Sequence, residues 1–293
     1  MPSNVLIGDN AVPVISTLSA TLKKKTVERA WALDGIDYKA YAPWLCLRPL
    51  LSQPIEDRHL LEPSYSPGGL VVDRGYLENI SRFVWGQGHA IMKDLPGDPK
   101  DWKILGDPAG VRPHIVQSFA SARQILERSA FFRAIYPSLV EMVIPLEREK
   151  SCGFSSMLAR GVVFRSFHKP YTAATLALDV AHEMGHQALI LLQSVDPLIS
   201  SDLMAPVFSE IRKQDRPAIQ SLHAAAALAY MLILSRSLKN NNEESDAVRQ
   251  REAEYGGSST ESVSKAIHSL KQKCQFTPMG SKVISEFEQI ISQ

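Results

Sequence analysis

The sequence predicts a mainly α-helical fold with a small β-sheet, an α+β chain. Apolar residues recur at helical spacing over long stretches after residue 110, which is typical of core-facing helices. Val162, Val163 and Phe164 follow Gly161 and form the β-branched and aromatic run that strands prefer. The 293 residues, 45% hydrophobic and 22% charged, suffice for one large domain or two modest ones.

The N-terminal region, residues 1–110, is irregular in pattern and rich in proline and aromatic residues. Short helical stretches are expected near residues 14–31 and 76–92. The composition is compatible with recognition of a substrate peptide or of its leader segment. We therefore expect two parts, this irregular region and a helical domain over residues 111–293.

The helical domain is expected to begin with helices over residues 115–128 and 130–147, the second interrupted by Pro137 and Pro145. The run around Val162 then predicts a β-hairpin over residues 154–167 that turns at 159–161.

Two long apolar helices follow the predicted hairpin. The first covers about 172–193 and ends before Asp196-Pro197. The second is expected to start with Asp215 as its N-cap and Pro217 in its first turn, and to run to about residue 238. A polar stretch with a short exposed helix and two closing helices, 261–274 and 281–292, complete the chain.

Charge and cysteine content exclude several classes of function. The formal net charge is +1 and the basic residues are scattered, so neither a nucleic-acid partner nor a membrane surface is expected. The three cysteines are far apart and do not form a disulfide framework. No stretch resembles a secretory signal or reaches membrane-spanning length, which predicts a cytoplasmic protein. The sequence leaves the oligomeric state open.

The first apolar helix contains His182-Glu183-Met184-Gly185-His186, an HExxH motif. On a helix this spacing places two imidazoles one turn apart on one face, with a carboxylate beside them. Burying these groups without partners costs about 1–3 kcal/mol for each unsatisfied group, and binding a metal removes that cost. The motif therefore predicts a metal site with His182 and His186 as ligands. Glu183 is the candidate catalytic residue, as a general base, as a direct ligand or as a group that orients a ligand or bound water.

A third ligand has to come from elsewhere in the chain. The extended metzincin pattern requires glycine and histidine where Leu189 and Leu192 stand, so that class is excluded. Glu210 is the candidate of a gluzincin type, although its polar neighbours predict a surface carboxylate. His223 lies on the second apolar helix among small residues that permit close approach, and it is the preferred third ligand. The expected fold is thus a buried HExxH helix packed against a second metal-ligand helix.

Three stretches of the second half resemble the HExxH-containing peptide-modification proteins of bacterial ribosomal-peptide gene clusters. These are the motif helix from Leu178, the linker from Pro206 to Arg216-Pro217 with the following Leu222-His223-Ala224-Ala225, and the turn Phe276-Thr277-Pro278-Met279-Gly280. The resemblance covers roughly residues 152–293. It departs from the family pattern at Ser209-Glu210-Ile211, where Ser-Pro-Trp is frequent, and at Phe276, where the family has leucine.

The resemblance implies an Fe(II)- and 2-oxoglutarate-dependent dioxygenase that hydroxylates a side-chain β-carbon of a ribosomally made precursor peptide. His182, His186 and His223 would hold the iron. Arg212 or Arg216 would pair with a carboxylate of the co-substrate, because the arginine fork suits that anion. For each arginine, a salt bridge with Asp215 or Glu210 is the competing interpretation.

The residues alone are equally compatible with a zinc metallopeptidase. In that alternative Glu183 is the general base that takes a proton from zinc-bound water. The strand over 162–165 would then bind the substrate backbone as an added strand. Three imidazoles suit zinc or iron alike, so ligand type does not choose the metal. A purely structural zinc site is disfavoured because such sites close with four Cys or His ligands, and no fourth is visible nearby.

Overall fold

The computed structural model describes residues 4–34, 68–71, 103–104, 113–147, 153–156, 159–167, 171–238, 242–255 and 257–293. The chain divides into two compact units. One contains residues 1–18, 121–135 and 172–293, and the other contains residues 19–120 and 136–171. Because both units draw on distant parts of the chain, they do not correspond to the functional division at residue 110, which stays a prediction.

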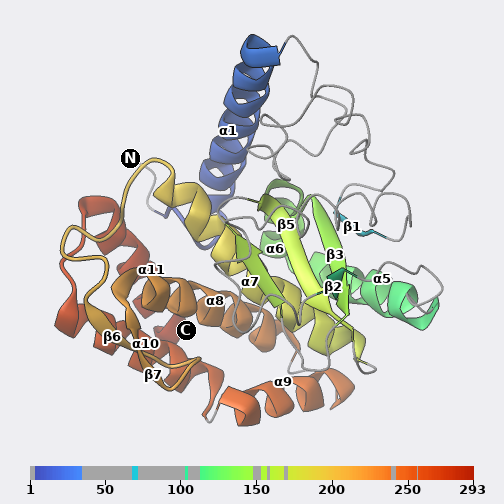
Figure 1. The fold of residues 1–293 in the computed structure, drawn as a ribbon. Coiled ribbons are helices and arrows are strands. Elements are labelled where there is room, and N and C mark those ends of the chain that lie inside the picture. The colour runs from blue at the N-terminus through green and yellow to red at the C-terminus, as the bar shows by residue number, and fades with distance from the viewer. Residues whose placement is uncertain are drawn as a thin grey trace. The chain divides into compact units, whose positions relative to one another are not determined.

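The second unit contains a mixed sheet built around two central strands (Figure 1). β3 (Met142–Glu147) pairs in parallel with β5 (Ala159–Ser166) and with the short β1 (Gly69–Leu70), while β2 (Lys103–Ile104) joins β3 in the antiparallel sense. β4 (Gly153–Ser156) pairs antiparallel with β5. Apolar side chains on both faces of β3 and β5 are buried, as is usual for parallel strands.

The helix expected over 130–147 is only partly present. α6 (Ala130–Leu139) carries Pro137 inside it, and residues 142–147, Pro145 included, form β3 instead. A short continuous apolar run is ambiguous between helix and strand, and here β-branched Val143 and Ile144 fit the buried strand. The expected hairpin is present as β4 and β5, but the strands are joined between Ser156 and Ala159, before the predicted turn.

The helical predictions for the start of the chain and for its second half are confirmed where residues are described. The observed helices are α1 (Ala11–Asp34), α5 (Pro113–Arg128), α7 (Ala173–Gln193), α8 (Ala218–Leu238), α9 (Asn242–Tyr255), α10 (Ser259–Lys273) and α11 (Pro278–Ser292). The stretch near 76–92 lies outside the described residues. The chain is therefore mainly helical with a small mixed sheet, in agreement with an α+β fold.

α8 is the centre of the first unit (Figure 1), where it packs against α7, α9, α10 and α11. Within the described part of the chain it is the one helix whose length and composition would allow it to cross a membrane, with a mean hydropathy of 1.5. However, 78% of that apolar window is buried inside the fold, as in a core helix. Residues Ala224 to Ala227 of α8 are buried, and their small side chains allow a neighbouring helix to come close.

α7 approaches α8 closely at Gly185. A Cβ atom at this position would lie 2.7 Å from the backbone oxygen of Ala226 and 2.9 Å from the Cα of Ala227. These are backbone atoms and cannot rotate away. The glycine of the HExxH motif therefore sets the distance between the two helices.

The linker between α7 and α8 contains a two-stranded hairpin that the sequence did not predict. β6 (Pro206–Ser209) pairs antiparallel with β7 (Gln214–Pro217), which places Val207 opposite Arg216. The prediction that Asp215 caps α8 is wrong, because Asp215 and Pro217 belong to β7 and the helix begins at Ala218. The proline restricts the residue before it to extended backbone, which favours the strand.

The turn at residues 276–280 anchors the loop that follows α7. Thr277 caps α11, and its Oγ1 donates a hydrogen bond of 2.6 Å to Asp196, while its backbone N–H donates to the Leu198 oxygen over 3.0 Å. Gly280 permits this contact, since a Cβ there would lie 1.8 Å from the same oxygen. Leu198 is held at a φ of 66°, a conformation that costs a residue with a side chain about 1–2 kcal/mol.

The N-terminal segment is held by a buried carboxylate. Glu286 on α11 accepts hydrogen bonds from the backbone N–H groups of Val5, Leu6 and Ile7 at 2.6, 2.9 and 2.8 Å. The Tyr230 hydroxyl on α8 donates to the Leu6 oxygen over 2.9 Å. These contacts tie the start of the chain to two helices of the first unit.

Replacing Glu286 with glutamine should destabilise the protein. The amide group of Glu286→Gln turns a donor toward backbone N–H groups, so at least one of them loses its acceptor at a cost of about 1–3 kcal/mol. Glu288→Gln on the same helix is the matched control, because its carboxylate is 46% exposed and pairs with Lys271 at the surface. Urea unfolding should show a free energy of unfolding lower by about 1–3 kcal/mol for Glu286→Gln. For Glu288→Gln the free energy of unfolding should change by less than about 1 kcal/mol. Equal effects would contradict this role.

Candidate metal centre

α7 holds the two motif histidines in a fixed geometry. Thr172 caps the helix by accepting a hydrogen bond from the Thr175 N–H, and apolar burial on either side of the motif keeps the helix rigid. The Nε2 atoms of His182 and His186 lie 3.1 Å apart. Their ring centres are 4.8 Å apart, with the planes at 77°.

The separation of the two Nε2 atoms fits shared coordination of one metal ion. Two metal–nitrogen bonds of about 2.1 Å that meet at about 95° span the observed 3.1 Å. The Nδ1 atom of His182 faces the sulfur of Met231 on α8 at 3.4 Å, so a hydrogen on Nδ1 would put the ring lone pair on Nε2. The pair therefore meets the geometric requirement for two ligands.

His223 on α8 joins this pair across the helix interface. Its ring centre lies 5.5 Å from that of His186, a distance that two imidazole ligands of one ion reach at an angle of about 115°. Its Nε2 atom is hydrogen-bonded to Oε1 of Gln193 at 2.9 Å. Among the described residues, no three potential ligand side chains already converge on one point. Coordination by all three histidines would thus need a rearrangement of the rings.

The environment favours the neutral, ligating form of the imidazoles. Burial lowers the pKa of His223 to about 4. Burial also places the pKa of His186 well below its ordinary value, and the charges of His182, His223, Arg212 and Arg216 lower it further. At neutral pH both rings have a nitrogen lone pair available for a metal.

Arg212 and Arg216 bring positive charge close to the histidines. Arg216 lies on β7, half-buried, and burial and the charge of Arg212 both lower its pKa. Within the described chain neither arginine makes a hydrogen bond or an ion pair, since Glu210 pairs with Lys213 at 2.9 Å instead. The salt bridges with Asp215 or Glu210, which were the competing interpretation for these arginines, are therefore not formed there.

Ser209 adds a further polar group to the side of the hairpin that carries Arg216. The alternation of β6 places Val207 and Ser209 on its buried face, and Arg216 stands opposite Val207 on that same face. The Oγ atom of Ser209 is buried and has no hydrogen-bond partner in the described structure. An unpaired hydroxyl and an unpaired guanidinium on one face are suited to an anionic ligand.

The two remaining carboxylates of the prediction differ in their surroundings. Glu183 is 3% exposed, and as the neighbour of His182 on a helix it points about 100° away from that residue. Glu210 is 6% exposed, so the expectation of a surface carboxylate is wrong. Its ion pair with Lys213 occupies it in the described structure.

Three residues of the centre were not predicted from the sequence: Gln193, Ser209 and Met231. Gln193 could have been found from its spacing, because it stands seven residues after His186 and therefore lies two turns further along the same helix face. Met231 and Ser209 could not, since their places depend on how α8 and β6 pack.

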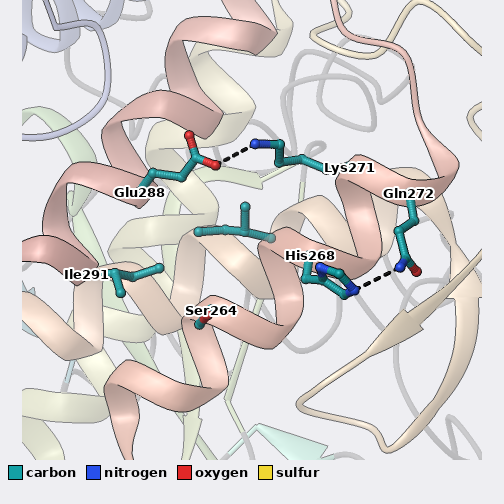
Figure 2. A pocket seen from close by; sticks show the side chains of 7 residues that line it. Ser264, His268, Lys271, Gln272, Glu288 and Ile291 are labelled. Atoms are coloured by element: carbon teal, nitrogen blue, oxygen red, sulfur yellow. Dashed lines mark hydrogen bonds and ion pairs between the residues drawn. The ribbon is translucent and has the colours of Figure 1, made fainter.

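A separate cavity of about 310 Å³ lies between α10 and α11 (Figure 2). In it Lys271 pairs with Glu288 at 2.6 Å, and Gln272 lies 2.7 Å from His268. None of the predicted site residues lines this cavity. Its lining is an ordinary set of surface contacts between two helices.

Comparison of the chain with protein-family models finds no match, and comparison with curated proteins finds none either. Function has to be argued from the chemistry of the site.

Gly185→Ala should weaken both the fold and the metal centre. The new methyl group would meet the backbone of α8, and such overpacking costs about 1–3 kcal/mol, more than the gain in helix propensity. Wider spacing of α7 and α8 would also separate His186 from His223. Gly257→Ala is the control, because the nearest atom to its Cβ is a side-chain oxygen at 3.4 Å. The midpoint of thermal unfolding and the zinc affinity should both fall in Gly185→Ala and stay at their native values in Gly257→Ala. A Gly185→Ala variant with native stability and zinc affinity would show that the helices are not closely packed at this residue.

Metal-free protein should lose stability as the pH falls from about 6.5 to about 4. In this window the unfolded chain protonates His223 while the folded chain, with a pKa of about 4, does not. Protonation of His223 accounts for at most about 3.4 kcal/mol of this loss. His186 acts in the same direction. Urea unfolding in the presence of a chelator measures the free energy of unfolding at several pH values. This free energy should depend less on pH in His223→Gln than in the native chain. An identical dependence would show that His223 is not buried in neutral form.

Proposed function

We propose that this chain is an Fe(II)- and 2-oxoglutarate-dependent dioxygenase that hydroxylates a side-chain β-carbon in a ribosomally made precursor peptide. The observation that carries the proposal is the combination of three clustered imidazoles, two of which burial keeps neutral, with two arginines that have no partner in the described structure. The paired helices α7 and α8 would form the metal-ligand pair that the sequence predicts.

The balance of charge supports an anionic co-substrate. The positive charges of both guanidinium groups already contribute to the lowered pKa of His186. A divalent ion would add two more positive charges to this cluster. Glu183 is the one acidic residue of the motif. A dicarboxylate such as 2-oxoglutarate would supply compensating charge at the metal and at an arginine.

Each residue of the centre would have a defined task. His182, His186 and His223 hold the ion, which when bound supplies the oxidation chemistry and keeps positions open for other ligands. Arg216 orients a carboxylate of the co-substrate, and Ser209 donates a hydrogen bond on the same face of the hairpin. Arg212 is exposed and serves as a second positive charge. Glu183 orients a histidine or a bound water from its buried position.

A zinc metallopeptidase with Glu183 as general base is the alternative. In the structure β5 pairs with β3 on one edge and with β4 on the other. The strand over 162–165 therefore has no free edge to which a substrate strand could add.

The remaining predictions follow from this function. The partners would be a precursor peptide and a small co-substrate, with the N-terminal region over 1–110 as the candidate for leader recognition. The location would be cytoplasmic, where such peptides are synthesised. Most of that N-terminal region lies outside the described residues.

Arg216→Lys should weaken binding of 2-oxoglutarate about tenfold or more while leaving the metal content intact. Lysine keeps the charge but loses the bidentate fork, and a charge-assisted hydrogen bond contributes about 1.5–3 kcal/mol. Binding can be followed by the absorbance of the anaerobic Fe(II) complex, and turnover by succinate release. Arg249→Lys is the matched control, because Arg249 is an exposed residue paired with Asp246 on α9.

The outcomes separate the two functions. Unchanged co-substrate binding in Arg216→Lys would remove that residue from the site. Absence of peptide-dependent succinate release from the iron-loaded native chain would overturn the dioxygenase. Peptide cleavage by the zinc-loaded chain that Glu183→Ala abolishes would establish the peptidase instead.

A further inference from the structure

We propose that Gln193 is a positioning residue of the metal centre, and that it makes His223 present Nδ1 to the ion while His182 and His186 present Nε2. The inference rests on the proposed metal site and adds to it a mixed set of ligating nitrogens.

Gln193 on α7 and His223 on α8 share a hydrogen bond. The amide oxygen Oε1 of Gln193 lies 2.9 Å from Nε2 of His223. An amide oxygen can only accept, so the hydrogen of this bond belongs to the ring nitrogen. A neutral imidazole carries one ring hydrogen, and the free lone pair of His223 is therefore on Nδ1.

In His182 and His186 the nitrogen that would face the ion is Nε2, not Nδ1. The Nε2 atoms of His182 and His186 face each other at 3.1 Å, so any shared ion lies on their Nε2 side. Nδ1 of His182 faces the Met231 sulfur at 3.4 Å, a weak acceptor for a ring hydrogen. Nε2 of His223, by contrast, is hydrogen-bonded to a side-chain oxygen, that of Gln193.

The position of Gln193 makes it a fixed support. It is the last residue of α7, two turns beyond His186 on the same rigid helix. Its Nε2 atom is buried and makes no hydrogen bond within the described structure, so the bond to His223 is the contact that orients the amide. A metal-bound histidine usually donates its second ring N–H to an acceptor of this kind.

The direct test is nitrogen-resolved NMR of the native chain labelled with ¹⁵N and loaded with zinc, a diamagnetic probe metal. Long-range ¹H–¹⁵N correlations distinguish the protonated from the metal-bound nitrogen of each ring. The proposal requires that zinc binds Nε2 of His182 and His186 and Nδ1 of His223. Coordination of His223 through Nε2 would overturn it while leaving the metal site standing. Failure to bind zinc at all would overturn both proposals.

The zinc affinity of Gln193 variants provides an independent test. Gln193→Leu should reduce it about tenfold or more, since loss of a partner of a metal ligand typically costs about 10–100-fold. Gln193→Glu retains an acceptor and should restore the affinity and the Nε2–H signal of His223. Ser194→Ala is the control, because that hydroxyl donates to the Ile190 oxygen within α7 and should not affect zinc binding. A Gln193→Leu variant with native affinity and an unchanged Nε2–H signal would refute the positioning role.

Discussion

The close approach of α7 and α8 at Gly185 is the constraint on which the candidate site depends. A side chain at this position would meet backbone atoms of Ala226 and Ala227 within 3 Å, so the absence of one lets the helices pack almost backbone to backbone. This contact brings His223 across the interface to a ring separation of 5.5 Å from His186. The glycine of the motif thus has a structural task, beside the chemical tasks of the two histidines and the glutamate.

The second requirement is that the linker after α7 holds its arginines near the histidines. Asp196 and Leu198 are bound by Thr277, and Gly280 lets α11 begin against the Leu198 oxygen. The ordered loop leads directly into β6, whose pairing with β7 places Arg216 on the same face as Ser209. The turn near the C-terminus is far from the motif in sequence, yet it supports the segment that carries the proposed anion-binding groups.

The helices of the second half could be predicted because their apolar patterns are long and their ends carry clear signals, such as Thr172 before α7 and Thr277-Pro278 before α11. Residues 142–147 could not, since a buried strand and a buried helix segment share the same continuous apolar pattern. The hairpin β6–β7 was missed because Asp215 and Pro217 also match the start of a helix. The predicted histidines are brought together by packing, whereas Gln193, Ser209 and Met231 depend on contacts that no local pattern encodes.

The central claim is that three histidines from two helices bind one metal ion. X-ray absorption at the iron edge of the Fe(II)-loaded chain measures it most directly, because imidazole ligands give characteristic multiple scattering. Three imidazole nitrogens are expected at about 2.1 Å from the iron in the native chain, and two in His223→Ala. A native spectrum fitted by two imidazoles and a carboxylate, unchanged in His223→Ala, would exclude His223 as a ligand and favour Glu183 or Glu210 as the third ligand.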